Sequence, residues 1–164
     1  MFRKMRRSAQ LLSDKETVEM FKRATSATLA LHGDDDYPYS VPVSFVYHDH
    51  KIYFHGAKEG HKVDSIRRNA KASISVIDLD QIVPEAYTTY FRSAIAFGKI
   101  TEITDEEKMH DACVLLAQKY RPGYEENMEN EIKREFPALA VFEFDIEYLT
   151  GKEAIELVRA RKAV

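Results

Sequence analysis

The stretch Ile52-Tyr53-Phe54-His55-Gly56-Ala57-Lys58-Glu59-Gly60-His61-Lys62 decides how the chain is interpreted, because an apolar strand runs into a glycine-containing basic turn that opens a helix. Glycine lets backbone N–H groups approach an anion, and a helix N-terminus adds roughly half a positive charge. Lys62 and His61 offer side-chain donors at the same place. This layout favours a bound phosphate, although an ordinary strand-to-helix turn with solvated basic residues has the same local pattern.

The length and composition of the chain predict a single domain over residues 1–164. With 164 residues and 45% hydrophobic content, the chain is long enough for one well-buried core and short for two. A formal net charge of −3 gives no global attraction to nucleic acid. The sequence has neither an apolar run near the ~20 residues of a bilayer span nor an apolar N-terminal signal core. We therefore expect a cytoplasmic protein with no membrane or nucleic-acid partner.

Both ends of the chain are rich in charge. Four basic residues crowd the segment 1–9, which we expect to be a flexible arm, either solvated or held against a phosphate or a lipid surface. The segment 152–164 is expected to form a charged tail with helical character.

Capping residues and apolar periodicity predict the helices. Ser13 with Glu16, and Thr104 with Glu107, have the spacing of a capping box, in which each side chain accepts from the other residue's backbone N–H. The basic turn opens a further helix. The predicted helices span residues 14–25, 61–69, 104–120 and 125–136.

Alternating apolar and polar residues, rich in Val, Ile, Tyr and Phe, predict six strands. These span residues 28–32, 39–48, 51–55, 72–77, 87–103 and 140–148. The polar, proline-marked segment 78–85 is predicted to be a loop, and Gly98 a bend or bulge in the longest strand. The hairpin-rich order indicates a small antiparallel barrel with peripheral helices, a mainly β protein of the α+β class.

Pro42 falls inside the predicted strand 39–48. Proline has no N–H to donate to a neighbouring strand, so its presence implies an edge strand, a bulge, or a place where something else lies against the backbone. A flat ligand is one such occupant.

Other catalytic and metal-binding patterns are not met. His48 and His50 flank a turn and have no third ligand, so we expect no metal site. The spacing of Gly56 and Gly60 is not that of a phosphate-binding Walker loop, and no Gly-x-Ser-x-Gly elbow is present, which disfavours hydrolases. Cys113, the only cysteine, lies in an apolar helical pattern, and we interpret it as structural rather than nucleophilic.

Several segments together have the order and spacing of a known family. They are Met5-Arg6-Arg7, Gln10-Leu11-Leu12-Ser13, Leu29-Ala30-Leu31, the run from Tyr37 to Ser44, the stretch 52–62, and the run from Phe91 to Lys99. On these segments the chain resembles the flavin-binding split-barrel superfamily that includes pyridoxamine 5′-phosphate oxidase, and within it the 5-nitroimidazole-resistance (Nim) branch. The resemblance covers about residues 5–104.

This resemblance implies a split barrel that pairs as a homodimer, with an FMN in each groove between the two chains. The implied phosphate-binding residues are Lys62 and His61, with Gly60 and Ala57 allowing close backbone approach. The implied ring-binding residues are His55 and Gly56 on one strand, Val41, Pro42, Val43 and Ser44 on the adjacent one, and Arg92 and Ser93 on the long strand, commonly from the partner chain.

The resemblance also implies a flavin-dependent oxidoreductase that takes electrons from NAD(P)H and passes them to a small planar acceptor such as a nitroimidazole or another nitroaromatic compound. His55 is the candidate catalytic residue, as a proton relay, although it would equally serve to cap a strand. Tyr39 stands where the oxidase proper carries an arginine, which puts vitamin B6 chemistry in doubt. The alternative is a non-catalytic protein of the same fold that binds flavin (FMN or FAD), deazaflavin or haem.

Overall fold

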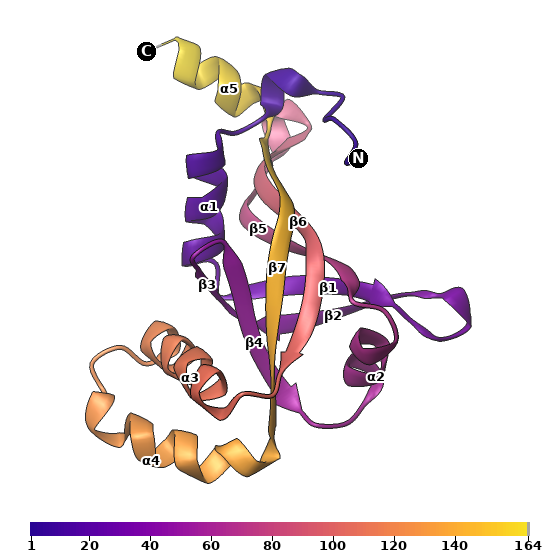
Figure 1. Ribbon diagram of the computed structural model, residues 1–164. Helices are drawn as coiled ribbons and strands as arrows, with labels where there is room; N and C mark the ends of the chain where they lie inside the picture. Colours follow the sequence, from indigo (N-terminus) through magenta and orange to yellow (C-terminus); the bar gives the residue numbers. More distant parts are fainter. Residues whose placement is uncertain (164) are drawn as a thin grey trace.

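A computed structural model describes residues 1–163, whose strands form one antiparallel sheet with the order β2-β1-β5-β6-β7-β4-β3 (Figure 1). Within these residues the sheet has seven strands, one more than predicted, because the expected strand 39–48 is divided at Phe45 into β2 and β3. The predicted mainly β, α+β architecture is confirmed. The strands are β1 (Ser26–His32), β2 (Pro38–Ser44), β3 (Val46–His48), β4 (Lys51–Ala57), β5 (Lys71–Val83), β6 (Thr88–Ile103) and β7 (Leu139–Glu153).

The two edge strands of this sheet are neighbours in the chain. β2 and β3 stand at opposite ends of the strand order, yet only Phe45 separates them. The sheet therefore curls until its edges meet, and β2 comes into contact with β4. Because β2 and β4 touch without pairing in the described residues, the barrel stays open along this line, as in a split barrel. Pro42 lies on an edge strand, which is one of the positions that its missing N–H predicted.

Aromatic side chains fill the barrel. Phe54 of β4 stacks on Phe142 of β7 with ring centroids 5.1 Å apart. Helix α1 (Asp14–Arg23) covers one opening and places Phe21 edge-on against Phe45 at 6.1 Å. The predicted capping box of α1 is confirmed, since Ser13 Oγ accepts from the Glu16 N–H while a Glu16 carboxylate oxygen accepts from the Ser13 N–H. The barrel core is therefore closed by a helix whose start was readable from sequence.

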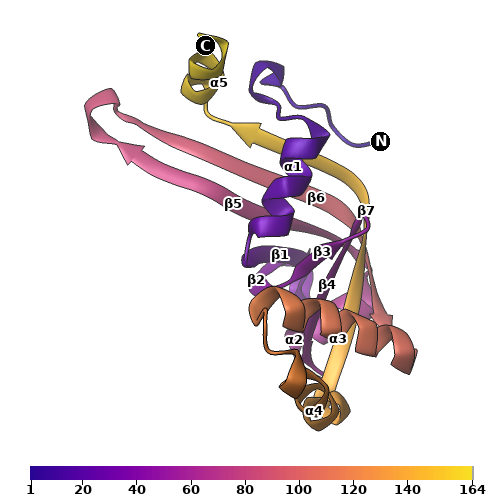
Figure 2. The same ribbon diagram turned by 90° about the vertical axis from the view of Figure 1, so that its left-hand side faces the viewer.

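The remaining helices lie outside the barrel. α3 and α4 pack as a pair on one side of it (Figures 1 and 2) and share a second apolar cluster with the buried Val141 of β7. Cys113 is buried in this cluster, as its sequence setting predicted. The N-cap of α3 is Asp105, not the expected Thr104, because the Asp105 carboxylate accepts from the Lys108 N–H at 2.9 Å. These helices are α2 (His61–Arg68), α3 (Glu106–Tyr120), α4 (Glu125–Glu135) and α5 (Ile155–Lys162), and the short 3-10 helices are η1 (Ser8–Gln10), η2 (Asp34–Asp36), η3 (Pro84–Ala86) and η4 (Phe136–Ala138).

The prediction of a loop over residues 78–85 is wrong. β5 continues to Val83 and pairs with β6 almost to the turn at η3, so the two strands form a long arm that projects from the barrel (Figure 2). A register shift between Ile77 and Leu79 lets the ribbon accommodate the polar segment. The bend predicted at Gly98 is confirmed by a register shift between Phe97 and Gly98 in the pairing of β6 with β7.

Short helices lie close to both ends of the described residues. The basic arm 1–9 leads into η1, where the buried Gln10 donates to the Glu153 carbonyl oxygen at 3.0 Å. The expected tail 152–164 begins as the last residues of β7 and continues as α5, and residue 164 lies outside the described residues. Within residues 1–163, the longest apolar helical stretch falls short of what crossing a bilayer requires.

Candidate functional site

The open line between β2 and β4 is the centre of the candidate site. β3 pairs with β4 only at Lys51, Ile52 and Tyr53, and β2 pairs only with β1 among the described strands. Residues 54–57 of β4 and the outer edge of β2 therefore leave backbone N–H and C=O groups without a strand partner on the side of this line. Such groups demand hydrogen bonds, and a planar heterocycle with a polar edge is able to supply them.

The two segments expected to border a flavin ring, 41–44 and 55–56, lie on these two strands. Ser44 and His55 line a common cavity, so the structure brings the ends of both segments together. Val41 and Val43 turn their side chains toward the core, while Pro42 and Ser44 are exposed. The valines therefore have only their backbone to offer a ligand on the outer face.

Lys62 is held against the end of β4. A Cβ added to Gly56 would lie 2.8 Å from Lys62 Nζ, so the lysine occupies space that any larger residue at this position would take. The same amine lies 5.9 Å from the centroid of the Phe54 ring. Burial lowers the pKa of Lys62, because its charged form is partly removed from water. An anion at this point would restore the lost stabilisation of the charge.

The start of α2 adds backbone donors beside Lys62. Gly60 is the N-cap with φ 121°, a conformation that favours glycine, and no side chain of the described residues caps this helix end. The first N–H groups of a helix point along its axis and carry partial positive charge. The strand end, the glycine turn and the helix start thus meet where the sequence predicted a phosphate.

His61 faces away from this point. Its ring stacks on Tyr39 with centroids 4.0 Å apart, and its Nε2 lies 3.6 Å from an Asp34 carboxylate oxygen. Arg68 donates to the same carboxylate at 2.7 Å, and this hydrogen bond holds the pKa of Asp34 below its usual value. In this arrangement His61 joins α2 to the β1–β2 hairpin and gives a phosphate less help than Lys62 does.

His55 points outward from β4 and is exposed at its edge. Desolvation by the surrounding atoms lowers its pKa, and the positive charge of Lys62 lowers it further. The ring is therefore neutral at pH 7, with one nitrogen able to donate and the other able to accept a proton. A neutral imidazole in this position is suited to relaying a proton.

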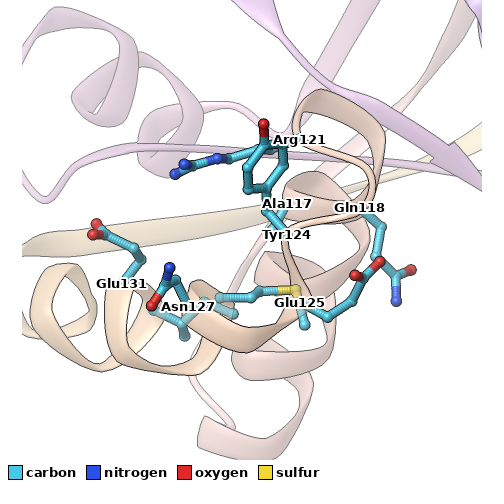
Figure 3. A pocket seen from close by; sticks show the side chains of 9 residues that line it. Ala117, Gln118, Arg121, Tyr124, Glu125, Asn127 and Glu131 are labelled. Carbon is cyan, nitrogen blue, oxygen red and sulfur yellow. The ribbon is translucent and has the colours of Figure 1, made fainter.

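Helices α3 and α4 cover the His55 side of the site, which the sequence did not reveal. A cavity of about 420 Å³ lies between them and the barrel. Its lining from the helices and β7 is mainly apolar: Cys113, Leu116, Ala117, Tyr120, Ile132 and Leu139, with Glu131 and Glu135 at the edge. A second cavity, of about 90 Å³, lies between α3 and α4 themselves (Figure 3) and has room for only a few water molecules.

The C-terminal end of α3 is anchored to the break between β2 and β3. Tyr120 Oη accepts from the Phe45 N–H at 2.8 Å, and Lys119 Nζ donates to the Phe45 carbonyl oxygen at 2.9 Å and to that of Ala24 at 2.5 Å. Sequence reasoning missed both residues, because a separation of about 75 positions leaves no local signal. The anchor fixes the cavity wall next to Ser44.

Arg92 and Ser93 lie far from the rest of the candidate site within one chain. β7 pairs with Gly56 at Ala140 and with Arg92 at Glu153, which places roughly 40 Å of strand between them. Arg92 donates to the buried Glu153 carboxylate at 3.1 Å, and Arg161 pairs with the same group. Arg92 therefore lies at the other end of β7 from the split of the barrel.

The histidines of the β3–β4 turn have local partners. His48 Nε2 lies 3.3 Å from an Asp49 carboxylate oxygen, and His50 Nδ1 lies 3.2 Å from the Tyr47 hydroxyl. Within residues 1–163, no three His, Cys, Asp or Glu side chains are grouped so that they would hold a metal ion.

Residues 13–153 match the model of the family described as pyridoxamine 5′-phosphate oxidase. No match is found among curated proteins. The fold is similar to a candidate 5-nitroimidazole antibiotic resistance protein from Bacteroides thetaiotaomicron, with 23% identity, a TM-score of 0.70, and coverage of 87% of this chain and 86% of that one.

Two further solved structures with this fold are named after their cofactors. The FAD and haem binding protein from Mycobacterium smegmatis has 22% identity, a TM-score of 0.73, and coverage of 87% of this chain and 71% of that one. The flavocytochrome Anf3 from Azotobacter vinelandii has 22% identity, a TM-score of 0.76, and coverage of 92% and 72%. At these identities the likeness shows the shared fold alone.

Proposed function

The chain belongs to the pyridoxamine 5′-phosphate oxidase family, and from this premise we propose that it is a homodimeric, FMN-dependent oxidoreductase that reduces a small planar acceptor of the nitroaromatic class. The observation that carries the proposal is the meeting of two unpaired strand edges with Lys62 and the start of α2. A flavin mononucleotide has a planar ring with a polar edge and a terminal phosphate. The strand edges suit the ring, and the Lys62 end suits the phosphate.

The residues present fit such a cofactor on structural grounds. Gly56 leaves the space that Lys62 fills, Lys62 is half-buried without a carboxylate partner among the described ion pairs, and Gly60 exposes the helix start. A partly buried cation in the first turn of a helix that no side chain of the described residues caps favours the binding of an anion. Similar structures named as FAD-binding proteins support a flavin at this site, without favouring FMN over FAD.

Vitamin B6 phosphate is a less suitable substrate for this chain. Tyr39 stands where the oxidase proper carries an arginine, and its ring stacks on His61. A nitro compound carries no phosphate and does not require a cation there. Its reduction to the nitroso level consumes two electrons and two protons and releases water, and a reduced nicotinamide supplies the electron pair with one proton as hydride.

The protein's own contribution is to bind, orient and manage protons. A bound flavin supplies the relay of electrons between the nicotinamide donor and the acceptor. Lys62 neutralises the phosphate, the edges of β2 and β4 orient the ring, and His55 relays the second proton from solvent through its neutral imidazole. Arg92 and Ser93 would complete the groove from the partner chain.

Removing the Lys62 amine tests the cofactor site. Lys62→Met keeps the length of the side chain and removes its charge, and we expect FMN to bind about tenfold more weakly, as one lost charge-assisted contact predicts. Lys58→Met is the matched control, because Lys58 is exposed in the same turn. FMN affinity is measured by quenching of flavin fluorescence, and equal affinities of the two variants would refute this placement of the phosphate.

A second candidate function is cofactor binding without turnover. Two structures with this fold are named as haem-containing flavoproteins, which supports testing haem as well as FMN, FAD and deazaflavin. The visible spectrum of the purified protein and the mass of the released chromophore distinguish these cofactors. Reoxidation of the bound flavin by nitrobenzene in the presence of NADPH separates an enzyme from a binding protein.

A further inference from the structure

We propose that the cavity beneath α3 and α4, here called the helical pocket, binds the acceptor and selects an uncharged planar aromatic compound. The helical pocket is lined by His55, Cys113, Leu116, Ala117, Ile132 and Leu139, among others. The inference rests on the proposed function, because the acceptor must lie next to the ring held at the split of the barrel. His55 and Ser44 are the residues common to both places.

The size and the lining of the helical pocket suit a small aromatic molecule. Its volume of about 420 Å³ falls within the range of ~300–1,000 Å³ typical of small-molecule sites. It exceeds the ~150 Å³ that suffices for benzene in an apolar cavity. Leu116 and Ile132 are buried and present aliphatic surface, and His55 and Tyr120 supply ring edges and polar atoms. A nitrobenzene or a nitroimidazole would be desolvated on the helix side and meet polar groups on the barrel side.

The charges around the helical pocket disfavour an anionic ligand. No lysine or arginine is among the described residues that line it. Glu131 and Glu135 stand at its edge, and Arg134 pairs with both, at 2.5 Å and 3.0 Å, so that this group of three carries one net negative charge. Lys119, half-buried at the end of α3, donates to backbone carbonyl groups, and Lys62, whose charge acts on His55, is the residue proposed to neutralise the flavin phosphate. In the flavin-loaded protein, a carboxylate or phosphate entering the pocket would lose hydration and find no cation among the described residues that line it.

The wall of the helical pocket is held in place before any ligand arrives. Tyr120 and Lys119 fix the end of α3 to Phe45, which is adjacent to Ser44. Cys113 and Ile132 meet across the α3–α4 contact. A pocket that is already formed costs little conformational entropy to fill, so it discriminates by shape and charge.

Filling the helical pocket from within tests the inference. Ala117 is half-buried on α3 and lines the helical pocket, whereas its exposed neighbour Gln118 lines only the smaller cavity between α3 and α4. In the flavin-loaded protein, Ala117→Phe should weaken the binding of nitrobenzene at least tenfold in equilibrium dialysis and leave FMN affinity unchanged. Gln118→Phe is the matched control and should bind nitrobenzene like the wild type. Nitrobenzene binding that is equal in both variants would overturn the pocket while leaving the flavin site standing.

The preference of the helical pocket for uncharged ligands is tested separately. Wild-type protein should bind 4-nitrobenzoate several-fold more weakly than nitrobenzene at low salt, and Glu135→Lys should reduce or reverse this preference. Glu135 is exposed, so this variant stays informative if Ala117→Phe fails to fold. Equal binding of the two ligands by wild-type protein would overturn the selectivity. If the wild-type protein binds no flavin and Ala117→Phe still loses nitrobenzene binding, the result would support the pocket and refute the flavin-dependent function.

Discussion

At the scale of single residues, the candidate phosphate site depends on a pair that lies close in sequence. Gly56 and Lys62 are both within the stretch that suggested the site, and the amine of one fills the space left by the missing side chain of the other. Local geometry brings them together, since a strand end, a short turn and a helix start are consecutive. This part of the site was therefore predictable, whereas the orientation of His61 toward Tyr39 and Asp34 was not.

The substitution Gly56→Ala distinguishes an effect on FMN binding from an effect on the stability of the fold. The added Cβ would meet Lys62 Nζ and Cε, which are the far end of a flexible side chain, so we expect the free energy of unfolding to change by less than about 1 kcal/mol. FMN affinity should nevertheless fall several-fold, because the displaced amine no longer lies at the phosphate. Urea denaturation and flavin titration measure the two effects. A variant with wild-type FMN affinity would show that the position of the amine is irrelevant.

The titration of His55 reports on its neighbour. Desolvation is the larger cause of its lowered pKa and the charge of Lys62 the smaller. Lys62→Met should therefore raise the pKa of His55 and still leave it below the ordinary 6.5. NMR titration of the ring protons measures this, with His55→Gln identifying the signal among the six histidines. An unchanged pKa would mean that the two side chains do not interact.

At the scale of secondary-structure elements, local signals placed the N-caps of α1 and α3 to within one residue, whereas the long-range pairing of strands could not be read from the sequence. The capping box of α1 involves residues three positions apart, and it was read correctly. The polar segment after Ile77 was mistaken for a loop, because its strand is stabilised by pairing with β6, across the turn at η3. The break at Phe45 contains neither glycine nor proline, and it is fixed by Lys119 and Tyr120 from α3. Contacts over such separations leave no periodic trace in the sequence.

The anchor of α3 should make stability depend on pH in the alkaline range. Burial lowers the pKa of Lys119 from 10.5 to about 8. As the pH falls from 10.5 to 8, the Lys119 amine takes up a proton in the unfolded chain before it does so in the folded one. Protonation therefore stabilises the unfolded state, and the wild-type protein loses stability relative to Lys119→Met. Above pH 10.5 both states are neutral at this residue, and below pH 8 both are charged, so the change is confined to the window between the two values.

The size of this effect follows from the shift. A pKa lowered from 10.5 to about 8 corresponds to at most about 3 kcal/mol, and because Lys119 is only half-buried we expect the difference in unfolding free energy between the wild type and Lys119→Met to change by about 2 kcal/mol across the window. Urea denaturation of both proteins at pH 8 and pH 10.5 measures it, and the comparison cancels the titration of groups that the two share. Parallel pH profiles would show that the amine titrates alike in the folded and the unfolded chain.

At the scale of the whole molecule, the arm formed by β5 and β6 exposes apolar side chains that nothing else within residues 1–163 covers. Ile77, Ile82 and Tyr87 are exposed at 72%, 74% and 98%, on a ribbon that projects into solvent (Figure 2). Exposed apolar surface of this kind marks a contact with another molecule. Arg92 lies on the same arm, at the other end of β7 from the residues that pair with the end of β4. A second copy of the chain would cover the apolar residues and bring its Arg92 to the groove.

Charging the arm tests this assembly and links it to cofactor binding. Ile77→Lys combined with Ile82→Lys should convert a dimer into a monomer in sedimentation equilibrium, since two buried isoleucines contribute about 1.5–3 kcal/mol each to an interface and two lysines repel. FMN affinity should fall in the same variant although its own Lys62 is unchanged, because the partner's half of the groove is lost. Gln81→Lys, an exposed neighbour on the arm, is the control for added charge. A doubly charged variant that remains dimeric would exclude this surface from the interface, and a monomer that keeps full FMN affinity would place the whole cofactor site within one chain.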